Sequence, residues 1–151
     1  MRLAPLYRVR FTYKQSWGVD IEGELGQERT LFLLAEGTCE GRIAGAFHAA
    51  NSPRRRVDRQ FLPDLHGAIQ TGDGATILCE YHGFGRPNPP GRRQVVLSAT
   101  HLSDHEKYRW LNDVICVGTG EVRTEENASE HRGNTTIVIH FSELIWEPTA
   151  D

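Results

Sequence analysis

Hydrophobic and polar residues alternate over several short stretches of the chain, and this period of two is typical of β-strands. An apolar run at 30–35 is also short enough to be a buried strand. Further strand patterns lie at 6–13, 62–84, 94–100, 113–122 and 135–146. With the glycine-containing stretch 37–48, they predict roughly eight or nine strands separated by turns. We interpret them as one all-β domain, a single antiparallel β-barrel over residues 1–151, because closure removes exposed strand edges and leaves room for a small ligand.

The segments between these strands carry turn and loop signals. Residues 17–26 are glycine-rich and acidic, which predicts a loop with a short extended piece. The run Arg54-Arg55-Arg56 in the loop 49–60 is typical of a solvated surface, and contact with an anionic ligand is the less favoured alternative. Ser103 opens a capping-box pattern that predicts a helix of one or two turns over 103–111. The glycines at 37, 41 and 45 predict bends where the barrel turns a corner.

The strongest local signal is a hairpin centred on Asp73-Gly74. With a two-residue loop, one face of the hairpin carries the side chains of Asp64, His66, Gln70, Ile77, Cys79 and Tyr81. With a three-residue loop over 72–74, Asp64 pairs with His82 and His66 pairs with Glu80. Tyr81 then moves to the opposite face, because register follows from loop length. We expect the first arrangement, and the sequence leaves the second open.

Composition excludes several function classes. The formal charge of −3 argues against a general nucleic-acid binder. No apolar run approaches the roughly 20 residues of a membrane span, and residues 1–10 lack the apolar core of a secretory signal. Cys39, Cys79 and Cys116 are widely spaced and match no zinc pattern. We therefore expect a cytoplasmic protein with reduced structural thiols, no membrane partner and no nucleic-acid partner.

Five segments in a fixed order resemble a family of small bacterial and fungal proteins, domain-of-unknown-function family 3237. They are Gly-Thr-Cys-Glu-Gly at 37–41, Asp-Leu-His at 64–66, Thr-Gly-Asp-Gly-Ala at 71–75, Tyr-Arg-Trp-Leu-Asn at 108–112 and Val-Gly-Thr-Gly at 117–120. The resemblance implies a lipocalin-like β-barrel and leaves the chemistry open. This chain has His66 where many relatives carry Arg, so a role of that Arg is not transferred to His66.

Candidate catalytic residues come from the hairpin. Asp64 and His66 are two apart on a predicted strand and point the same way, and a carboxylate beside an imidazole suits general acid–base catalysis. Tyr81 is a candidate to stabilise developing negative charge. The alternative is that Asp64 and His66 satisfy backbone groups or a neighbouring arginine, and that Tyr81 packs its ring.

Candidate substrate-binding residues follow the expected short helix. Arg109 would neutralise an anionic group, Trp110 would stack on a ring, and Asn112 would orient a carbonyl. The alternative is that Arg109 is solvated, Trp110 plugs the barrel end and Asn112 makes a turn.

The chain carries no dinucleotide fingerprint and no His-x-His pair, so we expect neither a cofactor nor a bound metal. Asp64 and His66 would complete a two-histidine, one-carboxylate site only if a distant histidine joined them.

These expectations lead to two hypotheses. The first is a cofactor-independent isomerase, lyase or cyclase acting on a small hydrophobic or aromatic molecule. The second is a non-catalytic carrier or sensor of such a molecule. A third, less specific possibility is a structural or assembly role through homo-oligomerisation, because dimerisation through an exposed strand would suit a barrel of this size.

Overall fold

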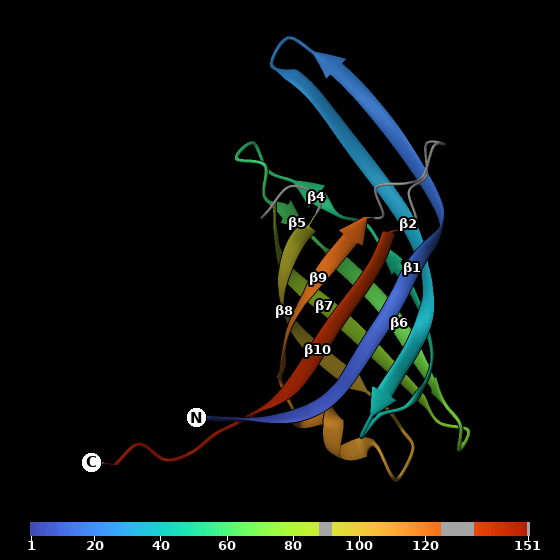
Figure 1. Cartoon of the computed structure of the whole chain (residues 1–151), viewed down its shortest axis with the longest axis vertical. Helices are drawn as coiled ribbons and strands as arrows, with labels where there is room; N and C mark the ends of the chain where they lie inside the picture. Colours follow the sequence, from blue (N-terminus) through green and yellow to red (C-terminus); the bar gives the residue numbers. More distant parts are fainter. Residues whose placement is uncertain (88–91, 125–134, 151) are drawn as a thin grey trace.

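The fold is a closed antiparallel β-barrel, shown in Figure 1 with the barrel axis close to vertical. The computed structural model describes residues 1–87, 92–124 and 135–150. Its strands are β1 (Arg2–Gly23), β2 (Gly26–Gly41), β3 (Gly45–Asn51), β4 (Arg54–Arg55), β5 (Phe61–Leu62), β6 (Asp64–Thr71), β7 (Thr76–Pro87), β8 (Arg92–Leu102), β9 (Cys116–Thr124) and β10 (Thr135–Ile145). Eight of these described strands form a ring, β7-β6-β3-β2-β1-β10-β9-β8, which closes where β8 pairs with β7. The all-β barrel expected from the pattern is confirmed.

Every second side chain along a barrel strand points into the barrel and packs in its interior. On β8 the buried positions are Val95, Leu97, Ala99 and His101, and the residues between them face solvent. In the middle of the barrel the ring of Tyr81 lies 4.5 Å from that of Phe141 and stacks on Phe47 at 6.0 Å, measured between ring centroids. Tyr81, Phe141 and Phe47 thus form an aromatic layer in the barrel core.

Strands β1 and β2 continue beyond the barrel as a long hairpin at the top of Figure 1. Their pairing runs to Gly23 opposite Gly26. The loop expected over 17–26 is therefore wrong. Pairing satisfies the backbone groups that each strand turns toward the other, and the rings of Trp17 and Phe32 lie 5.9 Å apart across the two strands.

The glycines at 37 and 45 mark places where neighbouring strands approach closely. A Cβ added at Gly37 would lie 1.9 Å from the backbone oxygen of Arg10, and one at Gly45 would lie 2.1 Å from that of Gln70. Only glycine allows this approach without a shift of the backbone.

The β6–β7 hairpin has the three-residue loop. The N–H groups of Thr71 and Gly74 bond to the carbonyls of Ala75 and Thr71, and Gly74 adopts a φ of 86°. Asp64 consequently pairs with His82, and His66 with Glu80. The expected two-residue register is wrong, and the alternative that the sequence left open is the one observed.

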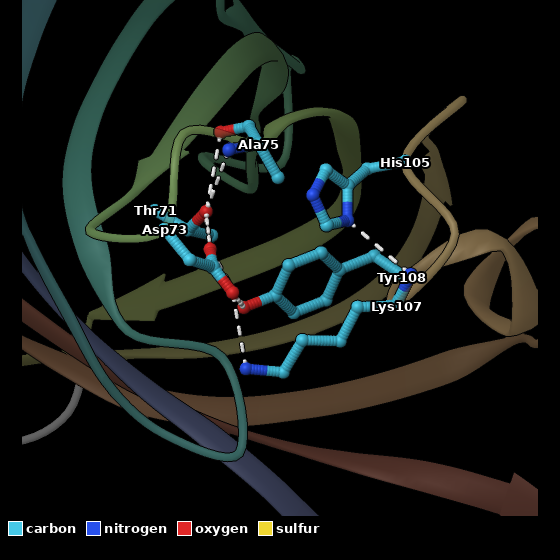
Figure 2. Close-up of polar contacts among 6 residues, drawn as sticks. All are labelled: Thr71, Asp73, Ala75, His105, Lys107 and Tyr108. Atoms are coloured by element: carbon cyan, nitrogen blue, oxygen red, sulfur yellow. Dashed lines mark hydrogen bonds and ion pairs between the residues drawn. The ribbon is translucent and has the colours of Figure 1, made fainter.

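A short helical segment closes the lower end of the barrel. The helix expected over 103–111 is a 3-10 helix, η1 (Arg109–Asp113), and Tyr108 precedes it. Figure 2 shows how this segment is tied to the β6–β7 loop through Asp73. The Asp73 carboxylate accepts hydrogen bonds from the hydroxyl of Thr71, from Lys107 Nζ at 3.1 Å and from the Tyr108 hydroxyl at 3.3 Å. These donors, that of Thr71 first, lower the pKa of Asp73 to about 2.

Candidate ligand-binding cavity

Above the aromatic layer the barrel encloses a cavity of about 390 Å³. Its walls come from the inward positions of the strands, from β4 and β5, and from the beginning of β8. The lining residues are Phe11, Tyr13, Leu31, Leu33, Asn51, Arg55, Phe61, Pro63, Leu65, Tyr81, Arg92, Arg93, Val95, Leu97, Val122, Thr124, Thr135, Ile137 and Ile139. The cavity reaches solvent at the β4–β5 end, because Arg55 and Arg92 are exposed there. A concave, mostly apolar space with few polar groups is typical of a small-molecule site.

A hydrogen-bonded pair, Tyr13 and Asn51, lies on the cavity wall. Asn51 is 1 % exposed. Its Oδ1 accepts the backbone N–H of Asp64 at 3.0 Å, so its Nδ2 donates to the Tyr13 hydroxyl oxygen at 2.8 Å. The hydroxyl hydrogen of Tyr13 has no acceptor among residues 1–87, 92–124 and 135–150, so it is available to a ligand. Burial raises the pKa of Tyr13, and Asn51 and Arg93 oppose that rise. Tyr13 is therefore a protonated donor near neutral pH.

Three arginines form a cationic rim at the open end: Arg55, Arg92 and Arg93. Arg93 occupies an inward position on β8, half-buried, with its guanidinium 4.7 Å from the centre of the Phe61 ring. Burial and the charge of Arg55 lower the pKa of Arg93. The described lining residues include no Asp or Glu, and none of the three arginines forms an ion pair with a described residue. The rim therefore presents positive charge to the cavity.

Below the cavity a chain of hydroxyl groups leads to a buried histidine. The hydroxyl of Tyr81 bonds to that of Tyr7 at 2.7 Å, and Tyr7 bonds to His101 Nε2 at 2.8 Å. His101 is 4 % exposed, and burial lowers its pKa to about 4. It is therefore neutral near pH 7 and completes an uncharged polar network inside the core.

The structure separates the expected catalytic residues. Tyr81 lines the cavity, whereas Asp64 and His66 point outward from β6, with side chains 51 % and 59 % exposed. The expectation that the three share one face is wrong, because the three-residue loop reverses the phase of β7 relative to β6.

The expected substrate-binding residues lie at the opposite end of the barrel from the cationic rim, in or beside η1 (Figure 1). Arg109 donates to the carbonyl of Asp104 at 2.9 Å, and Trp110 stacks under Arg42 at 4.8 Å. Asn112 bonds to both backbone groups of Ser103 at 2.8 and 3.0 Å. None of the three lines the cavity.

A family model described as "Protein of unknown function (DUF3237)" matches residues 1–144. The protein belongs to this family. No curated protein matches the chain. The described residues contain no helix long and apolar enough to cross a membrane.

Solved structures share the barrel of this DUF3237 protein. A β-barrel-like protein from Acinetobacter baumannii is 18 % identical with a TM-score of 0.73, and the match covers 94 % of each chain. A protein of unknown function from Clostridium acetobutylicum is 17 % identical with a TM-score of 0.76, covering 96 % of this chain and 100 % of that one. An enzyme from Penicillium herquei is 23 % identical with a TM-score of 0.61, covering 93 % of each. At these identities the likeness shows the fold.

Sequence reasoning missed Tyr13, Asn51 and Arg93 as site residues of this DUF3237 protein. The alternation of buried and exposed positions along β1 and β8 could have indicated two of these residues. Tyr13 continues the buried series at positions 7, 9 and 11, and Arg93 precedes the buried series at 95, 97 and 99. A polar or charged residue in phase with a buried series is a candidate for a cavity wall.

Proposed function

We propose that this protein binds a small molecule with an apolar or aromatic body and an anionic group inside the barrel, and that it acts as a cofactor-independent isomerase, lyase or cyclase. The observation that carries the proposal is one cavity that combines apolar walls, the donor Tyr13 and the cationic rim.

The apolar walls favour a ligand with a ring system. Phe11, Phe61 and Tyr81 contribute aromatic surface, and most other lining side chains are aliphatic. Burying an apolar ligand body against them is favourable by about 25 cal/mol per Å² of surface removed from water.

The cationic rim favours an acidic group on the ligand. A half-buried guanidinium such as that of Arg93 is costly without a counter-charge, and Arg55 adds repulsion. A carboxylate, phosphate or sulfonate at the rim would offset both effects, and Arg binds such groups through paired N–H donors.

Tyr13 is the group best placed to transfer a proton. In the proposed step its hydroxyl gives a proton to the bound molecule, and the remaining phenolate is stabilised by the Asn51 N–H and the charge of Arg93. A proton leaving another position of the same molecule returns to Tyr13. The net change is an isomerisation or ring closure, or an elimination when a leaving group departs with its bonding electrons. The enzyme from Penicillium herquei has the same fold, which supports a catalytic role for the barrel.

A carrier or sensor is the second candidate. One observation favours it: the described lining contains no carboxylate or imidazole, since Asp64 and His66 face outward. Such a protein would use the same walls and rim without proton transfer.

Two fluorescent probes with the same rings test the binding site. 8-Anilinonaphthalene-1-sulfonate carries an anionic group, and N-phenyl-1-naphthylamine lacks it. We expect both to bind, and Leu97→Trp to reduce both affinities by filling the cavity. Arg93→Gln should weaken the sulfonate about tenfold, equivalent to about 1.4 kcal/mol, and change the neutral probe little. Arg86→Gln, an exposed arginine outside the lining, is the matched control. Equal binding of both probes to wild type and Leu97→Trp, with circular dichroism unchanged, would contradict the proposal.

Deuterium incorporation separates enzyme from carrier. The protein is incubated in D₂O with a panel of aromatic carboxylates and phenols, and recovered ligands are analysed by mass spectrometry. An enzyme should exchange or convert at least one retained compound, and Tyr13→Phe should abolish that change while binding remains. If wild type binds ligands but they are recovered without deuterium and without conversion, the result would support a carrier.

A further inference from the structure

Four ionisable side chains form a ring on the outer face of the β6–β7 hairpin: Asp64, His66, Glu80 and His82. Asp64 Oδ1 lies 3.1 Å from His66 Nε2 and 3.4 Å from His82 Nδ1. Glu80 lies on the other side, 3.6 Å from His66 Nδ1 and 3.6 Å from His82 Nε2. Each imidazole therefore has one nitrogen toward Asp64 and the other toward Glu80.

The three-residue loop brings the ring together. It pairs Asp64 with His82 and His66 with Glu80, so each carboxylate has a histidine directly opposite and another two residues along its own strand. His82, which is distant in sequence, therefore lies beside Asp64 and His66, and the three residues provide two histidines and one carboxylate.

We propose that Asp64, His66 and His82 bind a divalent transition-metal ion of the zinc class. One ligand atom from each of the three lies within 4.8 Å of the others. Zinc bonds of about 2.0–2.1 Å in a tetrahedron place ligand atoms about 3.3 Å apart. The distances from Asp64 to the two imidazole nitrogens already match that value. Metal binding would require rotation of the exposed imidazoles to bring their two nitrogens, which lie within 4.8 Å of each other, to the same separation.

Glu80 lies beside the two imidazole nitrogens that do not face Asp64. A histidine that binds metal through one nitrogen typically donates its other N–H to a carboxylate, which fixes the tautomer and the ring orientation. Glu80 Oε1 and Oε2 each face the nitrogen that Asp64 leaves free, one on His66 and one on His82.

The fourth coordination position faces solvent, because all four side chains are about half exposed. The site is thus an open three-ligand site that holds a water or an external donor. It lies on the outside of the barrel wall, and its existence does not depend on the cavity or its ligand. Bound metal would also clamp β6 to β7 and stabilise the folded state by mass action.

The test uses the full chain without an affinity tag, freed of metal by chelation. Zn²⁺ is titrated in competition with a fluorescent chelator, and Co²⁺ is added separately to record the visible absorption of a tetrahedral complex. We expect one equivalent of Zn²⁺, intense Co²⁺ absorption and a higher unfolding temperature with Zn²⁺. His66→Gln and His82→Gln should each weaken binding at least a hundredfold. Glu80→Gln should weaken it about tenfold, as expected for a residue that orients ligands.

His140→Gln removes another exposed strand histidine and is the matched control. It should bind Zn²⁺ like wild type. Because the four side chains face solvent, the variants should fold, and circular dichroism checks this. No saturable Zn²⁺ binding by wild type, or Zn²⁺ binding by His66→Gln and His82→Gln as tight as that of wild type, would overturn the proposal and leave an ion-pair ring without metal.

Discussion

The side chain of Asn51 links the backbone of Asp64 to the hydroxyl of Tyr13, through bonds of 3.0 and 2.8 Å. The backbone of β6 thereby fixes the orientation of a hydroxyl on the inner wall of the barrel. The bond from the Asp64 N–H orients the amide so that Nδ2 faces Tyr13, and an amide NH₂ group can only donate, so the Tyr13 hydroxyl oxygen is the acceptor.

Replacement of Asn51 by Ala should destabilise the protein by about 2 kcal/mol, because it removes two hydrogen bonds and leaves a backbone N–H without its acceptor. Urea unfolding at pH 7 measures the change. Ser98→Ala is the control, since Ser98 is exposed and its bond to the carbonyl of His82 is long at 3.4 Å. Equal midpoints for the two variants would show that the Asn51 bridge contributes nothing to stability.

Gly37→Ala should destabilise the barrel by about 2 kcal/mol or more, because the new methyl group would overlap the backbone of β1 and force the strands apart. The matched variant is Gly23→Ala, where an added Cβ meets nothing within 4 Å. Thermal unfolding followed by circular dichroism compares them. A Gly37→Ala protein as stable as Gly23→Ala would mean that β1 and β2 separate easily at this point.

The alternating pattern was sufficient to predict the barrel, the positions of most strands and the hairpin at Asp73-Gly74, but it missed the extension of β1 and β2 over 17–26. It could not decide the phase of β7, because loops of two and three residues are both compatible with the same turn residues. The loop length is fixed by contacts of Thr71, Gly74 and Ala75 that appear only in three dimensions. One residue of loop length moved Tyr81 inside the barrel and left Asp64 and His66 outside.

The candidate site was less predictable than the fold. Arg55 and Arg93 are far apart in sequence and meet only because β4 and β8 lie at the same end of the barrel. The arginine run 54–56 was expected to be a solvated loop, yet Arg55 lines the cavity. Trp110 and Asn112 matched the family motif, but the contacts of their side chains are local and close the other end.

The three cysteines should be inert in the folded protein. Burial raises the pKa of Cys39 and Cys79 to about 12 and that of Cys116 to about 11, so almost no thiolate is present at pH 8. A chromogenic disulfide reagent should label no thiol in native protein and all three after unfolding in urea. Ser98→Cys, which adds an exposed thiol, should react at once and serves as the control. Rapid labelling of native wild type would contradict the buried positions.

His101 should make stability depend on pH between about 6.5 and 4. The histidine binds a proton near pH 6.5 when unfolded, but burial lowers its pKa to about 4 in the barrel. As the pH falls through this range, the unfolded state gains the proton first, so the free energy of unfolding decreases. The loss is complete below about pH 4 and amounts to roughly 3 kcal/mol, while above pH 6.5 this group contributes no pH dependence.

Urea midpoints at pH 7 and pH 4.5 measure this loss. His101→Gln removes the titrating group, so its midpoint should change less between the two pH values than that of wild type, even if the variant is less stable at both. His140→Gln should follow wild type, because His140 faces solvent on β10. An equal decrease in wild type and His101→Gln would show that groups other than His101 account for the acid sensitivity between pH 7 and pH 4.5.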